Sequence, residues 1–197
     1  MKTIFIDCGF HHGEGLVGFV EKGIITQGTK VYTFEPNPEC KIFERVNRIK
    51  QQFDLDITGI EKAVWIRDGI IEFFQEDHTI SNTGSPTDGT SNIDGWGSSV
   101  KEVNFIHLGY GNPIETPCIN FSEFLKSLPE SNIICKMDIE GSEYDVLRYL
   151  IKENSISLIN ELYVEFHERF IEHESKETES DLTEQIQSFG VKVHNWF

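Results

Sequence analysis

Positive charge is scarce in this sequence. Only 17 lysines and arginines stand against 33 aspartates and glutamates, which gives a formal net charge of −16. A surface this acidic repels phosphate backbones, and no dense run of lysine and arginine suggests a local basic groove. We therefore expect no nucleic acid among the partners of this protein.

Long apolar runs are also missing. No stretch reaches the length of a membrane-spanning helix, and the amino terminus offers one lysine and a very short apolar run, unlike a signal peptide. The cysteines show no C-x-x-C spacing of a metal or redox motif; they are Cys8, Cys40, Cys118 and Cys135. These absences lead us to expect a cytoplasmic protein with reduced thiols and no membrane partner.

The first turn of the chain combines a strand, a glycine loop and a helix start. Residues 4–6 form an apolar run that Asp7 ends, and Gly9, Gly13 and Gly15 follow before apolar residues restart at helical spacing. In an open α/β sheet, a ligand binds beyond the carboxyl end of such a strand. A plain turn with glycines for tight packing explains this loop alone equally well.

A second acid favours the ligand-binding interpretation. Glu35 ends the next apolar run, at a spacing that suits the carboxylate that receives the hydroxyl groups of a ribose. The glycine loop reads Asp-x-Gly-x-x-x-Gly-x-Gly, which is not the G-x-G-x-x-G pattern of NAD and FAD sites, and no phosphate-binding G-x-x-x-x-G-K-[ST] loop occurs. A ligand with a ribose but no phosphate fits these residues, and S-adenosylmethionine is the common one.

Four pieces of the chain resemble the FkbM-type class I methyltransferases. They are IDCGFHHGEG, YTFEPNPEC, EKAV followed by RDG, and KMDIEGSEYDVL followed by YVEFH, so the resemblance runs from about Thr3 to His167. One departure stands in the first piece, where family members commonly carry a small residue and Asn in place of His11 and His12.

This resemblance implies an α/β fold in one domain over residues 1–197: a single doubly wound, mostly parallel sheet with helices on both faces, as in Rossmann-like class I methyltransferases. Strands are expected at residues 57–64 and, after a hairpin turn at 67–69, at 70–74. One helix should open at Pro38, and the last helix should lie near residues 182–189.

An irregular insert at about residues 77–104 interrupts this pattern. It is dense in Ser, Thr, Asn and Gly, and such a long irregular segment in a compact domain typically forms a lid or a disordered tip. Trp96 favours the lid, because large aromatic side chains rarely lie in a fully solvated loop. Ser98 and Ser99 close the segment and are candidate contacts of the acceptor or of the cofactor.

The resemblance also assigns cofactor contacts. It places a cradle for the methionine part at the glycine loop, a ribose site after the second strand and an adenine site at the Glu61–Val64 segment. The residues expected to contact S-adenosylmethionine are Asp7, Gly9, His11, Gly13, Glu35, Pro36 and Ala63.

The segment KMDIEGSE carries the candidate catalytic chemistry. Lys136, Asp138 and Glu140 alternate, so they point to one side of an extended segment, where charge is costly unless it is paired or lines a cavity. Asp138 is expected to remove the proton of an acceptor hydroxyl, or to hold a divalent cation that does so. The alternative is that Lys136 and Asp138 are structural partners, and that Glu140 and Glu143 only complement a helix dipole.

Glu165 and His167 end the neighbouring strand. His167 is a candidate general base, because its unperturbed pKa lies near neutrality. Asp138, Glu165 and His167 together could hold magnesium or manganese. A single histidine is often structural, so the sequence leaves both readings of His167 open.

The sequence therefore predicts an S-adenosylmethionine-dependent O-methyltransferase that acts on a hydroxyl of a small acceptor, with the resemblance favouring a sugar or glycan. Two alternatives stay open. The protein could methylate an amine of a small metabolite, or it could be a non-catalytic binding module with a methyltransferase-like fold, which the departures at His11 and His12 favour.

Overall fold

The computed structural model describes residues 2–75, 99–100, 113–168, 171 and 174–196. The strands are β1 (Thr3–Cys8), β2 (Lys30–Phe34), β3 (Asp56–Ile60), β4 (Ala63–Trp65), β5 (Gly69–Phe73), β6 (Ile114–Asn120), β7 (Asn132–Met137), β8 (Glu161–Val164) and β9 (Lys192–Asn195). The helices are α1 (Glu14–Glu21), α2 (Ile42–Phe53), α3 (Phe121–Ser127), α4 (Glu143–Lys152) and α5 (Lys176–Ser188), with 3₁₀ turns η1 (Pro38–Cys40) and η2 (Ile156–Leu158).

The larger sheet has six strands in the order β3-β2-β1-β7-β8-β9, and each neighbouring pair is parallel. The chain moves outward from β1 to β2 and β3, then returns to place β7 on the other side of β1. Ligands in open α/β sheets bind at this reversal of strand order. The predicted α/β class with a mostly parallel sheet is confirmed.

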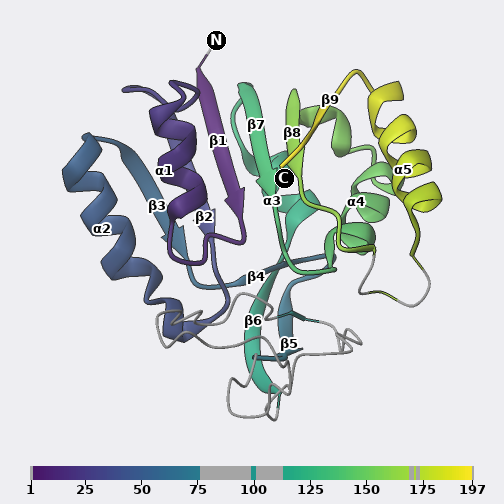
Figure 1. Cartoon of the computed structure of the whole chain (residues 1–197), viewed down its shortest axis with the longest axis horizontal. Helices are drawn as coiled ribbons and strands as arrows, with labels where there is room; N and C mark the ends of the chain where they lie inside the picture. The colour runs from purple at the N-terminus through teal and green to yellow at the C-terminus, as the bar shows by residue number, and fades with distance from the viewer. Residues whose placement is uncertain (1, 76–98, 101–112, 169–170, 172–173, 197) are drawn as a thin grey trace, which may run out of the picture.

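Helices cover both faces of this sheet, as predicted (Figure 1). The strand pleat sends alternate side chains to opposite faces, so Ile4 and Ile6 join the core under α3, α4 and α5, whereas Phe5 joins the core under α1 and α2. Phe5 packs on Phe19 of α1 with ring centroids 4.7 Å apart. No helix in the described part of the chain is long and apolar enough to cross a membrane.

A smaller sheet lies beyond the carboxyl edge of the larger one, in the order β4-β6-β5 (Figure 1). Here two predictions were wrong. The expected strand at 57–64 is two strands in different sheets, because the chain turns after Ile60, whose carbonyl accepts a hydrogen bond from the backbone of Lys62. The turn at 67–69 closes no hairpin, because β6, from much later in the chain, lies between β4 and β5.

Two predicted helix starts also differ from the structure. Pro38 opens only the 3₁₀ turn η1, and α2 begins after Lys41, whose φ of 48° is incompatible with a continuous helix. Helix α5 begins at Lys176, earlier than expected, because the Ser175 side chain accepts a hydrogen bond from the backbone of Thr178 and caps it.

Gly9 allows the loop after β1 to touch the loop after β7. Its φ is +85°, and a Cβ built there would lie 1.8 Å from the backbone oxygen of Asp138. Only a residue without a side chain permits this contact.

We therefore predict that Gly9→Ala destabilises the protein by about 2–5 kcal/mol, from overpacking and from the left-handed backbone. Gly18→Ala is the matched control: Gly18 lies inside α1 with nothing within 4 Å of the added Cβ, so this change should stabilise by about 0.5–1 kcal/mol. Urea unfolding of the three proteins measures both effects. Equal stabilities for the two variants would contradict the close approach.

Candidate active site

Three carboxylates meet at the carboxyl edge of the larger sheet, on neighbouring strands. Glu35 directly follows β2, Asp7 is the penultimate residue of β1, and Asp138 directly follows β7. Asp7 is buried, Glu35 is buried, and the side chain of Asp138 is partly exposed. Three of the residues predicted from the sequence to act on a ligand therefore lie on neighbouring strands at the reversal of strand order.

Lys136 is a buried cation that contacts two of these acids, Asp7 and Asp138. Its buried Nζ donates a hydrogen bond to the backbone oxygen of Gly9 at 2.6 Å, and it lies 3.1 Å from Asp138 Oδ2 and 3.4 Å from Asp7 Oδ1. Burial alone would lower the pKa of Lys136, but the charges of Asp7 and Asp138 outweigh it and raise the pKa. Lys136 is thus a permanent charge that fixes both acids and the glycine loop.

Asp7 shares this single cation and is otherwise poorly satisfied. Burial raises the pKa of its carboxyl to about 6, against the lowering effect of Lys136. Neither of its oxygens receives a hydrogen bond of normal geometry from the described part of the chain. A buried carboxylate in this condition is suited to receive hydrogen bonds from a ligand, such as those of an ammonium group.

Glu35 holds the glycine loop through backbone groups. Its Oε2 accepts a hydrogen bond from the backbone N–H of His11 at 2.6 Å, and its Oε1 accepts one from that of Asn37 at 2.8 Å. Burial raises the pKa of Glu35 to about 7, although these two hydrogen bonds lower it. Each oxygen keeps a further lone pair, so the carboxylate can still receive a pair of hydroxyl groups.

The smaller sheet contacts the segment that follows Glu35. Thr116 Oγ1 of β6 donates a hydrogen bond to the Pro36 oxygen at 3.4 Å, and Gln75 Nε2 donates one to Asn37 Oδ1 at 2.9 Å. Ala63 is buried in β4, which is an edge strand of the smaller sheet. The smaller sheet therefore holds Pro36 and Asn37, which directly follow Glu35, in place.

His167 lies buried among four acids. Its Nδ1 is 2.6 Å from Glu143 Oε1, and its Nε2 faces three further carboxylates. The separations from Nε2 are 3.3 Å to Glu140, 3.7 Å to Glu165 and 4.0 Å to Asp138. The structure thus brings together the predicted residues Asp138, Glu165 and His167.

These acids change the chemistry expected of His167. Burial lowers the pKa of the imidazole, but the hydrogen bond and charge of Glu143, with the charges of Glu140 and Asp138, raise it overall to about 10. Burial also raises the pKa of Glu140 to about 8, despite the nearby His167. At neutral pH His167 is therefore an imidazolium that holds the acids together, a state that does not suit a general base.

Three charged residues of this site are not among those that the sequence predicts to act on a ligand. The sequence suggests Lys136 only as a structural partner of Asp138, and Glu140 and Glu143 only as complements of the helix dipole. Glu140 lies 3.3 Å from His167 Nε2. Glu143 instead lies fully buried and accepts hydrogen bonds from His167 and from the backbone of Ile139. The sequence feature that could have identified Lys136 and Glu143 is a charged residue whose neighbours are apolar and become buried.

The remaining predicted positions are only partly described. Gly13 caps α1 with a φ of 91°. Ser99 is buried, and its backbone pairs with Phe74 at the end of β5. Trp96 and Ser98, with most of the expected lid at 77–104, lie outside the described residues.

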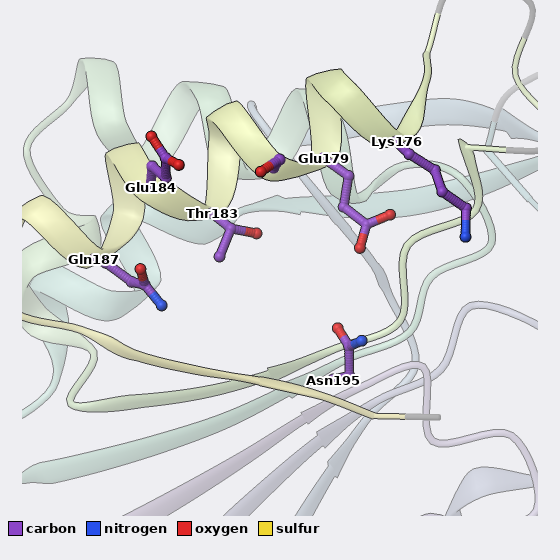
Figure 2. A pocket seen from close by; sticks show the side chains of 7 residues that line it. Lys176, Glu179, Thr183, Glu184, Gln187 and Asn195 are labelled. Atoms are coloured by element: carbon purple, nitrogen blue, oxygen red, sulfur yellow. The ribbon is translucent and has the colours of Figure 1, made fainter.

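A separate hollow of about 440 Å³ lies between α5 and the end of β9 (Figure 2). Side chains of α5 face Asn195 across it, and its lining is polar and charged, including Lys176, Glu179 and Glu184. None of the residues predicted to act on a ligand lines it. We therefore locate the candidate active site at the sheet edge.

Comparisons with known proteins identify the family of this domain and a similar fold. The model of the Methyltransferase FkbM domain matches residues 7–190. Among solved structures, the methyltransferase FkbM from Methylobacillus flagellatus KT has a similar fold, with a TM-score of 0.52 and 19% sequence identity. The similarity covers 94% of this chain and 36% of that one, so the chain spans about a third of the length of its solved relative. A search of curated proteins found no match.

Loss of the Lys136 charge should destabilise the protein. We predict that Lys136→Met costs about 3–5 kcal/mol, because it leaves Asp7 and Asp138 without their shared cation. Lys30→Met is the matched control, since the ion pair of Lys30 with Asp56 is far more exposed and should be worth at most about 1 kcal/mol. Urea unfolding measures both, and equal losses would contradict the role of Lys136.

The raised pKa of His167 predicts a pH dependence of stability. Because the folded pKa of about 10 exceeds the unfolded value of 6.5, the contribution of His167 is complete below pH 6.5 and is lost as the pH rises through 10. The stability difference between the unmodified protein and His167→Gln should shrink by on the order of 5 kcal/mol across that window.

Chemical unfolding in chelator-treated buffer at several pH values provides the measurement. His194→Gln is the control for the loss of a histidine, because His194 is far more exposed than His167. A pH-independent difference for His167→Gln would show that the imidazole is neutral in the folded protein.

Proposed function

Because the chain belongs to the FkbM methyltransferase domain family, we propose that it transfers the methyl group of S-adenosylmethionine to a hydroxyl of a small acceptor, a sugar or glycan. The observation that carries this proposal is the row of acids Glu35, Asp7 and Asp138 on neighbouring strands, with Lys136 beneath them.

The residues present fit S-adenosylmethionine. Asp7 offers buried carboxylate oxygens with unused hydrogen-bonding capacity, which suits the ammonium group of the methionine part. Glu35 keeps a lone pair on each oxygen for the two ribose hydroxyls. Pro36, next to it in the chain, and Ala63 of β4 stay the proposed apolar contacts of the cofactor. Gly9, His11 and Gly13 supply loop backbone between them. When bound, the cofactor supplies an electrophilic methyl group.

Asp138 is the residue we propose to act on the acceptor. A neutral hydroxyl is a poor nucleophile until its proton is removed, and a positioned base typically contributes about 10²–10⁴-fold. Lys136 fixes the orientation of the Asp138 carboxylate from below, and the partial exposure of Asp138 leaves it open to an acceptor. His167 holds the surrounding acids in place, and the imidazolium is a proton donor rather than a base at neutral pH.

The acids around His167 also fit a divalent cation, magnesium or manganese. Asp138, Glu143 and His167 offer ligand atoms within 4.8 Å of one another, and Glu165 lies beside them. The hydrogen bond of Nδ1 to Glu143 leaves Nε2 facing the remaining acids, so a cation there would replace the Nε2 proton of the imidazolium and the positive charge that it supplies to these acids. Bound there, the cation would supply positive charge for the acceptor oxygen.

The direct test is transfer of an isotopically labelled methyl group from S-adenosylmethionine to a panel of sugars and nucleotide sugars, with mass detection of the product. We predict that Asp138→Asn keeps cofactor binding within a few-fold and lowers the rate by about 10²–10⁴-fold. Asp56→Asn, which changes an exposed acid of β3, should keep full rate.

A chelator arm separates the two roles of Asp138. Loss of activity on chelation, with recovery on addition of magnesium or manganese, would assign Asp138 to the cation; activity that resists chelation would assign it to the proton. If only amines are methylated, the protein is an N-methyltransferase and the proposed hydroxyl acceptor is wrong. If the cofactor binds but no compound of the panel is methylated, the result favours a non-catalytic binding module. Calorimetry that detects neither S-adenosylmethionine nor S-adenosylhomocysteine binding would refute the methyltransferase proposal.

A further inference from the structure

A second group of possible metal ligands lies outside the acid cluster. His11 and His12 come from the glycine loop, and Cys40 ends the turn η1 after β2. One ring nitrogen of each histidine and the Cys40 sulfur all lie within 4.8 Å of one another. Segments well separated in the sequence thus bring two imidazoles and a thiol together.

Nitrogen and sulfur ligands of this kind select a particular class of metal ion. Imidazole and thiolate suit Zn²⁺ and similar borderline ions, whereas magnesium and calcium prefer oxygen. Zinc bonds of about 2.0–2.3 Å place tetrahedral ligands roughly 3.3–3.6 Å apart, so the present group must close by roughly 1 Å. The histidine side chains are about one-fifth exposed, and rotation of their rings can supply that movement.

The backbone on both sides of the group is already fixed. Glu35 accepts the hydrogen bond of the His11 N–H and holds this residue at a φ of 49°, a conformation that is uncommon outside glycine. The rings of His11 and His12 stack with centroids 3.8 Å apart. On the other side, the Arg45 side chain donates a hydrogen bond to the Cys40 oxygen at 2.7 Å.

Nearby acids make the position attractive to a cation. Glu14 places one carboxylate oxygen 3.8 Å from each histidine ring. Glu35 and Glu39 act on Cys40 as further negative charges, against the one positive charge of Arg45. Glu14, two-thirds exposed, is free to swing toward an ion as a fourth ligand.

We propose that His11, His12 and Cys40 form a binding site for a divalent ion that prefers nitrogen and sulfur ligands, represented by Zn²⁺, with Glu14 or water in the fourth position. On binding, the thiol releases its proton to solvent and the sulfur donates a lone pair to the ion. The bound ion would clamp the glycine loop to the segment after β2, the two segments that carry Asp7 and Glu35.

A reactive role for Cys40 is the competing explanation. Burial raises the pKa of the Cys40 thiol, with the charge of Glu35 adding to the effect, and the side chain is almost fully buried. A protonated, inaccessible thiol is a poor nucleophile and a poor target for oxidation. A metal ion, unlike an oxidant or an electrophile, also has two imidazole ligands beside the thiol to help it displace the proton, so the grouping of the three side chains favours a metal site over a reactive cysteine.

Cobalt provides the test, because Co²⁺ occupies zinc sites and reports its ligands by absorption. The full chain, stripped with chelator, is titrated with Co²⁺. We expect a thiolate-to-cobalt charge-transfer band in the near ultraviolet, with an intensity that corresponds to one cobalt–thiolate site per chain, and displacement of the band by Zn²⁺. Cobalt bound among Asp138, Glu143 and His167 has no sulfur ligand and gives no such band. The readout does not depend on methyl transfer, so its failure leaves the proposed function untouched.

Variants assign the ligands. Cys40→Ser should abolish the charge-transfer band, and His12→Asn should lower the affinity for Co²⁺ by at least about 10-fold, the loss typical of even indirect changes to metal sites. Cys118→Ser, another buried thiol, should keep the band. Circular dichroism verifies folding of each variant. Absence of the band in the unmodified protein, its persistence in Cys40→Ser, or unchanged affinity in His12→Asn would overturn the proposal.

Discussion

The candidate site depends on one buried ammonium group. Removing a lysine from water is costly, and the cost is offset only where oxygens surround the charge. Lys136 finds them in Asp7, in Asp138 and in the carbonyl of Gly9, which come from β1, from the end of β7 and from the glycine loop. Because a single cation serves two acids, the end of β1 and the segment after β7 hold their positions together, and the buried Asp7 depends on Lys136 for its charge partner.

His167 organises the other half of the edge in the same way. Lys136 contacts the acids at the ends of β1 and β7. The imidazolium of His167 lies close to the acids that follow β7 and β8. Asp138 belongs to both groups, because it faces Lys136 on one side and His167 on the other. In the proposed methyltransferase, this shared acid stands between the half that would hold the cofactor and the half that would meet the acceptor.

The sequence predicts those features that local residues determine. Apolar runs such as residues 4–6 mark the buried strands, and Gly9 marks the close approach of two loops. What it could not predict depends on contacts between distant segments. The turn at 67–69 reads as a hairpin because no local signal shows that β6 will lie between its arms. Likewise, Glu143 reads as an ordinary acid at a helix start until the fold buries it against His167.

The antiparallel pair β5 and β6 has a consequence for how this protein can diversify. Phe73 pairs with Ile114, so the chain leaves the smaller sheet and re-enters it at adjacent points. Closing a connection between fixed points costs only about 0.6 kcal/mol for each doubling of its length. Natural selection can therefore lengthen, shorten or replace the connection between these two points, while the larger sheet and the acids at its edge keep their register.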